Sequence, residues 1–189
     1  MRSAFTILIA LGTSLAATAQ MNTTSKKEAS VEVGGAPMYP SKNIIDNAVN
    51  SADHTTLVAA VKAAGLVETL SSKGPFTVFA PTNAAFAKLP KGTVESLLEP
   101  ANKSKLNAVL TYHVIPGKFS AADVSAEIKK GNGKATMKTV AGGELTFTMM
   151  GKDLMVADAG GTLCKVTIAD VNQSNGVIHV VDGVLLPKM

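Results

Sequence analysis

The sequence predicts one α+β domain in which helices come first and strands follow. The chain has 189 residues, which is room for about one domain of ordinary size. Hydrophobic residues make up 46% of it and charged residues 17%, a balance that can bury a core. Apolar residues recur with a helical period in the first part of the chain and with a period of two from Ala135 onward. Because the two patterns are segregated, a sheet with alternating crossover helices is disfavoured.

The first 19 residues have the three-part form of a secretory signal peptide. Met1-Arg2-Ser3 is a short positive start, residues 4–12 are apolar, and Ala17-Thr18-Ala19 is a small-residue cleavage site before Gln20. The apolar run is shorter than the about 20 residues that a membrane-spanning helix needs. We therefore expect cleavage near Ala19, no stable membrane insertion, and a secreted protein that is periplasmic or extracellular.

Residues 20–40 are polar, small and aperiodic, so they predict a flexible leader. The folded domain is expected over residues 41–189. Its first helix should start near Asn43, and a second should follow Asp53, a potential cap, and end at Gly65. A short strand is expected over residues 76–80, between Gly74-Pro75 and Pro81.

A further helix is expected from about Asn102, with His113 on its apolar face, running into Val114-Ile115 and ending before Pro116. The segment from Ser120 to Asp123 resembles a capping box and predicts a short helix that ends near Gly131. Alternation then predicts strands over residues 136–140, 144–149, 154–157, 163–171 and 177–186. The Asn175-Gly176 pair suits a tight turn that makes the last two strands antiparallel.

The basic balance of the chain does not predict nucleic-acid binding. Without residues 1–19 the chain keeps 17 Lys against 14 acidic residues, a net charge of +3, and it loses Arg2, its single arginine. Lysine does not reproduce the bidentate contacts of arginine to guanine and phosphate. With no Trp and two Tyr, few aromatic rings remain to stack on bases.

No segment carries a recognisable catalytic or metal-binding motif. A Gly-x-Ser-x-Gly elbow and closely spaced His, Cys or acidic ligands are absent from the sequence, so no enzyme activity, metal or cofactor is expected. Cys164 is interpreted as a buried, inert thiol, with a reactive or intermolecular cysteine as the alternative. His113 and His179 are interpreted as imidazoles whose nitrogens bond to backbone or hydroxyl groups, with a role in a site as the alternative.

Three segments together resemble the signatures of fasciclin (FAS1) domains. They are residues 76–86, Tyr112-His113 with the following Val114-Ile115-Pro116-Gly117, and residues 175–187. Their order and spacing also fit, and the resemblance covers about residues 41–189. It implies a compact wedge or sandwich of β-strands with several helices packed in the N-terminal half, in a single-domain secreted protein of bacterial type.

Fasciclin domains are extracellular adhesion and interaction modules, so the resemblance implies a non-enzymatic module that binds a cell-surface or extracellular matrix protein or polysaccharide. In animal members, an Asp followed by an aliphatic residue and the Tyr-His segment have been implicated in integrin-mediated adhesion. The matching positions here are Asp170-Val171 and Tyr112-His113, which become the candidate partner-binding residues; a purely structural role is the alternative reading for them.

Two other functions stay open at this point. Some algal family members bind carotenoid, so this protein can be imagined as a carrier of a lipophilic small molecule. Met137, Met149, Met150 and Met155 would then line an adaptable apolar surface, although methionines also simply fill cores. An exported hydrolase is the remaining alternative.

Overall fold

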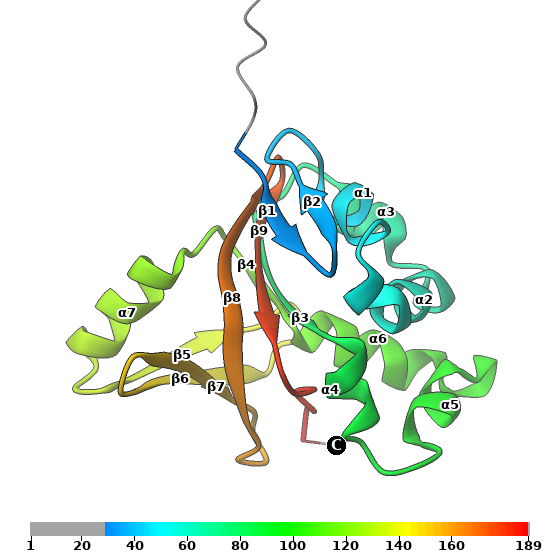
Figure 1. Ribbon diagram of the computed structural model, residues 1–189. Coiled ribbons are helices and arrows are strands. Elements are labelled where there is room, and N and C mark those ends of the chain that lie inside the picture. The colour runs from blue at the N-terminus through cyan, green and yellow to red at the C-terminus, as the bar shows by residue number, and fades with distance from the viewer. Residues whose placement is uncertain (1–28, 189) are drawn as a thin grey trace, which may run out of the picture.

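The computed structural model describes residues 29–188 (Figure 1). The expected signal peptide and residues 20–28 of the expected leader lie outside the described residues. The described chain confirms the α+β class: helices dominate before residue 131 and strands after it.

A seven-stranded sheet with the order β4-β3-β9-β8-β7-β6-β5 forms the centre of the molecule. Its strands are β3 (Phe76–Pro81), β4 (Val114–Pro116), β5 (Lys134–Lys138), β6 (Glu144–Met150), β7 (Asp153–Ala157), β8 (Leu163–Gln173) and β9 (Gly176–Val181). Strand β3 pairs in parallel with β9, and the other neighbours are antiparallel. The two ends of the sheet approach each other, since the N–H of Val140 donates to the carbonyl of Val114 at 2.8 Å. The sheet is therefore nearly closed.

Helices cover the sheet on two sides (Figure 1). On one side lie α1 (Ile44–Ala48), α2 (Thr55–Ala64), α3 (Val67–Ser71), α4 (Asn83–Ala87), α5 (Thr93–Leu98) and α6 (Lys103–Tyr112), with short 3₁₀ turns at Ala52–His54 and Pro100–Asn102. On the other side lies α7 (Ala121–Lys130), which packs against β5 and β6.

The core is divided between these two sides. One apolar cluster joins the first group of helices to β3 and β9, and includes Leu57, Leu110 and Ile178. The other joins α7 to the β5–β8 strands and includes Val124 and Phe147. In each cluster most of the buried side chains come from the faces of helices and strands whose apolar periodicity predicted burial.

Local sequence signals explain most element ends. The Ser120 hydroxyl accepts from the N–H of Asp123, whose carboxylate accepts from the N–H of Ser120, so the predicted capping box is confirmed. Asn43 caps α1, and Gly65 ends α2 in the left-handed conformation at a φ of 74°. The expected cap at Asp53 is wrong, because a 3₁₀ turn precedes α2 and no side chain caps it.

The structure corrects the leader that was expected over residues 20–40. Within it, β1 (Val31–Val33) and β2 (Ala36–Met38) form a hairpin through Gly34-Gly35, which has the positive φ values that a two-residue turn needs. Val33 and Met38 are each only 1% exposed and belong to the first core cluster. Three-residue strands give too short an alternation to be recognised in a polar segment.

Two other boundaries differ from expectation. Strand β4 was not predicted, because its residues continue the apolar pattern of α6 and were assigned to the end of that helix. Strand β9 ends at Val181 and not at Leu186; the chain bends at Asp182, which still bonds to the backbone of Lys165 on β8 through its N–H and its carboxylate.

Candidate functional site

Tyr112 and His113 lie at the end of α6, inside the molecule. Tyr112 is 1% exposed, and its hydroxyl donates to the carbonyl of Glu144 at 2.7 Å and accepts from the N–H of Ala159 at 3.0 Å. Gly143 lies against the ring, where an added Cβ would come within 2.6 Å of it. The tyrosine therefore joins α6 to β6 and to the loop after β7.

His113 is 3% exposed and uses both ring nitrogens on backbone groups. Nδ1 is 2.8 Å from the carbonyl of Val109, and Nε2 accepts from the N–H of Leu185 at 3.0 Å. This pair of partners requires a neutral ring with the proton on Nδ1. Burial lowers the pKa of His113 to about 4, opposed by its bond to Val109 and the charge of Asp158.

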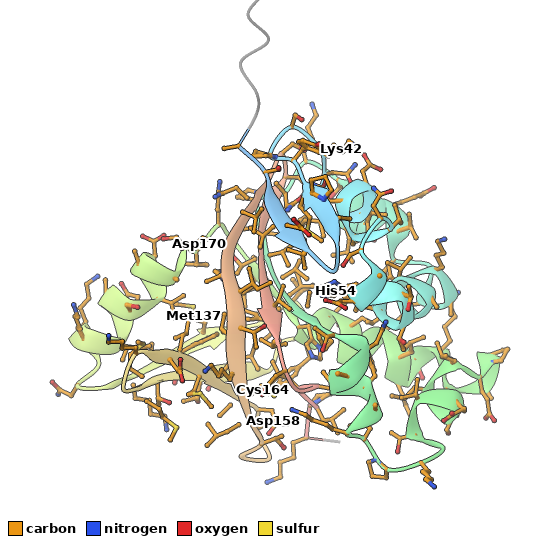
Figure 2. All side chains as sticks on the ribbon, viewed as in Figure 1. Lys42, His54, Met137, Asp158, Cys164 and Asp170 are labelled. Carbon is orange, nitrogen blue, oxygen red and sulfur yellow. The ribbon has the colours of Figure 1, made fainter. Side chains whose placement is uncertain are left out.

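Asp170 and Val171 lie at an irregular stretch of β8. Asp170 has a φ of 58° between register shifts of the β8–β9 pair, and lies on the side of the molecule that carries α7 (Figure 2). Its carboxylate accepts from the N–H of Ala121, the first residue of α7, at 2.7 Å. Val171 is fully buried in the first core cluster. Both residues of this motif are thus engaged within the fold.

His179 on β9 is the second fully enclosed imidazole of the signatures. Nε2 is 2.9 Å from the carbonyl of Phe119, and Nδ1 accepts from the N–H of Asp170 at 3.3 Å. The ring stacks on Phe79 with 5.4 Å between centroids. Burial lowers the pKa of His179, opposed by the bond to Phe119 and the charge of Asp170. The interpretation of both signature histidines as backbone-bonded imidazoles agrees with this geometry.

The four candidate residues do not converge on one surface. Asp170 lies beside His179 and the segment that enters α7, whereas Tyr112 and His113 make side-chain contacts with residues 144, 159 and 185. Tyr112, His113 and Val171 are buried, so they offer almost no surface to a partner. Their positions point to folding roles.

A serine and a histidine that the sequence analysis passed over lie in contact. The Ser51 hydroxyl is 2.9 Å from Nδ1 of His54, and both side chains are buried. Gly34 packs directly on the pair, because a Cβ there would lie 2.4 Å from the Ser51 oxygen. Burial lowers the pKa of His54, opposed by the backbone of Ala80 and the charge of Asp53. The dyad has the atoms of an activated nucleophile but no access for a substrate.

Cys164 is buried on β8, as expected. Burial, together with the charges of Asp182 and Asp158, raises the pKa of its thiol to about 11. At neutral pH the thiol stays protonated and is a poor nucleophile.

An enclosed apolar cavity lies between α1, α2, α6 and β3, with Ile44, Leu57 and Leu110 in its wall. Its volume is about 30 Å³. Sites that bind a drug-sized molecule measure about 300–1,000 Å³, so the cavity as it stands does not hold a carotenoid. The four methionines considered for such a ligand are not in its wall.

An open groove of about 450 Å³ lies between α7 and the edge strand β5. Phe119, Ala135 and Met137 supply apolar surface, and Lys130, Lys134 and Glu127 supply charge. Among the described residues, no group of three His, Cys, Asp or Glu side chains is arranged to hold a metal ion. No helix within residues 29–188 has the length and apolar character needed to cross a membrane.

Comparison with known proteins gives a consistent result. A family model described as "Fasciclin domain" matches residues 52–187. Protein sll1483 of Synechocystis sp. is 50% identical over 188 residues, which cover 98% of this chain and 96% of that protein. Cell surface glycolipoprotein MPB83 of Mycobacterium bovis is 38% identical over 122 residues, which cover 65% of this chain and 48% of that protein.

A solved structure resembles the fold. It is titled "Novel Fold Revealed by the Structure of a FAS1 Domain Pair from the Insect Cell Adhesion Molecule Fasciclin I", and it aligns with a TM-score of 0.69 at 15% sequence identity. The alignment covers 85% of this chain and 58% of that chain. At this identity the likeness shows the fold alone.

Proposed function

The chain belongs to the fasciclin family, and from this premise we propose that it acts outside the cytoplasm as a non-enzymatic interaction module. Its partner would be a cell-surface or extracellular matrix protein or polysaccharide. The names of two similar proteins support this, since one is a cell surface glycolipoprotein and the other a cell adhesion molecule.

The proposal that the protein is not an enzyme rests on the hydrogen bonds that the signature side chains make within the fold. A general base needs a nitrogen or oxygen within reach of a substrate. In His113 and His179 both nitrogens are bonded to backbone groups of the fold, and the Asp170 carboxylate holds the start of α7. These groups hold strands and helices together and leave the outer surface of the domain to make contacts.

The lipophilic carrier receives less support from the structure. The apolar cavity would have to grow more than tenfold from its about 30 Å³ to reach the size of ordinary ligand sites. Met150 is 58% exposed and Met149 39% exposed, so these two methionines face solvent. Filling the cavity would require α1 and α2 to move away from the sheet.

A retention experiment tests the proposal. Purified protein is incubated at micromolar concentration with intact cells and with isolated envelope polymers of its host, and the bound fraction is measured after washing. We expect saturable retention, and none of the turnover that a hydrolase would give on ester, peptide and glycoside substrates. N-terminal sequencing of the protein recovered from the host tests export, with Gln20 as the expected first residue. If the protein is retained on none of the cells or polymers, its proposed role as an interaction module is refuted.

A further inference from the structure

We propose that the groove between α7 and β5 binds a segment of an anionic polysaccharide, whose carboxylate or sulfate groups pair with the lysines along β5. This inference rests on the proposed function and names the partner class and the surface. It follows from three features: a local excess of positive charge, a groove of suitable size, and a wall that the fold holds in place.

Positive charge is concentrated where α7 meets β5. Residues 127–144 contain four lysines, Lys129, Lys130, Lys134 and Lys138, and two acidic residues, Glu127 in the groove wall and Glu144 opposite Lys138 on β6. All four are exposed. Only Lys130 has an ion-pair partner among the described residues, Glu127 at 2.6 Å. The segment therefore attracts polyanions, and its effect is strongest at low ionic strength.

The groove combines this charge with an apolar floor. Its wall includes Phe119, Ala135 and Met137, while Lys130, Lys134, Thr136 and Glu127, which pairs with Lys130, supply polar atoms. The apolar face of a sugar ring packs well on an aromatic ring and aliphatic groups, and its acidic substituents can reach the ammonium groups at the rim. A volume of about 450 Å³ lies in the range of ordinary ligand sites. It suits a short stretch of polymer.

The wall that carries Phe119 is held rigidly by the fold. The N–H of Phe119 donates to the Thr77 hydroxyl at 2.9 Å, and its carbonyl accepts from His179 at 2.9 Å. Its ring packs over Gly117, where a Cβ would lie 2.8 Å from the ring edge. Asp170 holds the next turn through the N–H of Ala121. His179 and Asp170 thus act as positioning residues, which reduces the entropy lost on binding.

A polysaccharide fits the groove better than a nucleic acid or a folded protein. The described chain has no arginine for bidentate phosphate contacts. A stable protein interface buries about 800 Å² on each partner, which is more than a groove of this size provides. A linear polymer needs only a few subsites, each weak, and gains affinity by engaging repeated units.

Affinity electrophoresis in gels containing polygalacturonate or dextran sulfate, with neutral dextran as the reference, tests the proposal. We expect wild-type protein to be retarded by both anionic polymers and not by dextran. The Lys134→Glu/Lys138→Glu variant should bind at least about tenfold more weakly, and Lys134→Arg/Lys138→Arg should retain binding. Phe119→Leu, which leaves the net charge unchanged, should weaken binding by about fivefold because the aromatic platform is lost.

The matched control is Lys73→Glu/Lys105→Glu, which makes the same change in net charge at exposed lysines that lie neither on α7 nor on β5. It should alter binding by less than about twofold. Equal weakening by the control, or equal retardation in neutral dextran, would overturn the groove as the site. Should the Lys134→Glu/Lys138→Glu variant still be retained on cells like the wild type, the groove is refuted while the interaction module stands. Loss of all retention by the wild type refutes the module itself.

Discussion

His179 donates from Nε2 to the carbonyl of Phe119, 2.9 Å away, and so ties the last strand of the sheet to the segment that enters α7. The same ring accepts the N–H of Asp170 on its other nitrogen. One neutral imidazole on β9 is therefore bonded both to β8 and to the segment before α7, which is 60 positions away in the sequence. His179, a residue of the second signature, thus contributes to the fold by bonding to backbone groups of Phe119 and Asp170.

Replacing His179 by Ala should destabilise the protein by about 3 kcal/mol, because it leaves a buried carbonyl and a buried N–H unpaired and opens space beside Phe79. Urea denaturation followed by circular dichroism measures this free energy of unfolding. The folded fraction should also bind polygalacturonate more weakly, since Phe119 loses one anchor. A loss below about 0.5 kcal/mol would show that the imidazole is not required for the fold.

Three substitutions at Asp170 are expected to lower the stability of the protein by different amounts, in a defined order. Asp170→Asn keeps an oxygen for the N–H of Ala121 and a residue type that tolerates a φ of 58°, so it should be nearly neutral. Asp170→Gly loses the acceptor without backbone strain, at about 1 kcal/mol, and Asp170→Ala adds about 1 kcal/mol of left-handed strain. Thermal unfolding of the three variants gives the order. An alanine variant as stable as the glycine variant contradicts it.

The sequence predicted the fold class and most elements because their signals are local. The capping box at Ser120, the stop at Gly65 and the alternation along β6 each depend on a few neighbouring residues. The antiparallel pair of β8 and β9 is confirmed, but the turn expected at Asn175-Gly176 lies one residue earlier, at Ser174-Asn175, and Gly176 is the first residue of β9. Strand β3 lies between β4 and β9 in the sheet, and no local signal in the sequence indicates these partners.

What the sequence could not predict depends on contacts between distant segments. The hydrogen bonds of His113 go to Val109 and to Leu185, 72 positions further on, and no spacing rule predicts the second. The groove forms because α7 folds back beside β5. The motifs considered for partner binding are instead largely buried, where they connect elements of the fold. The lysines within residues 129–138 are evident in the sequence, but the sequence does not show that α7 packs against β5 and brings them close together.

Acid should destabilise the protein through His113. Because its pKa falls from 6.5 to about 4 on folding, the unfolded state binds the proton more readily. The stability that the neutral ring contributes is complete above pH 6.5 and decreases as the pH falls toward 4, by about 3 kcal/mol. The lowered pKa values of His179 and His54 act in the same direction.

A variant without the titrating group isolates this effect. His113→Gln should be less stable than wild type at pH 7, and the difference between the two free energies of unfolding should shrink as the pH falls from 6.5 to 4. Urea denaturation at a series of pH values measures it. A difference that stays constant over this range would mean that His113 is not the acid-sensitive group.

The hairpin at residues 31–38 should be part of the folding unit, although the family match begins at residue 52. Met38→Ala removes a side chain that is 1% exposed and should cost about 3 kcal/mol, because β2 cannot fully close the space left over α1. Glu32→Ala, at an exposed position of β1, should change stability by less than about 0.5 kcal/mol. Urea denaturation of both variants distinguishes the hairpin from a leader, since in a leader neither substitution would affect unfolding.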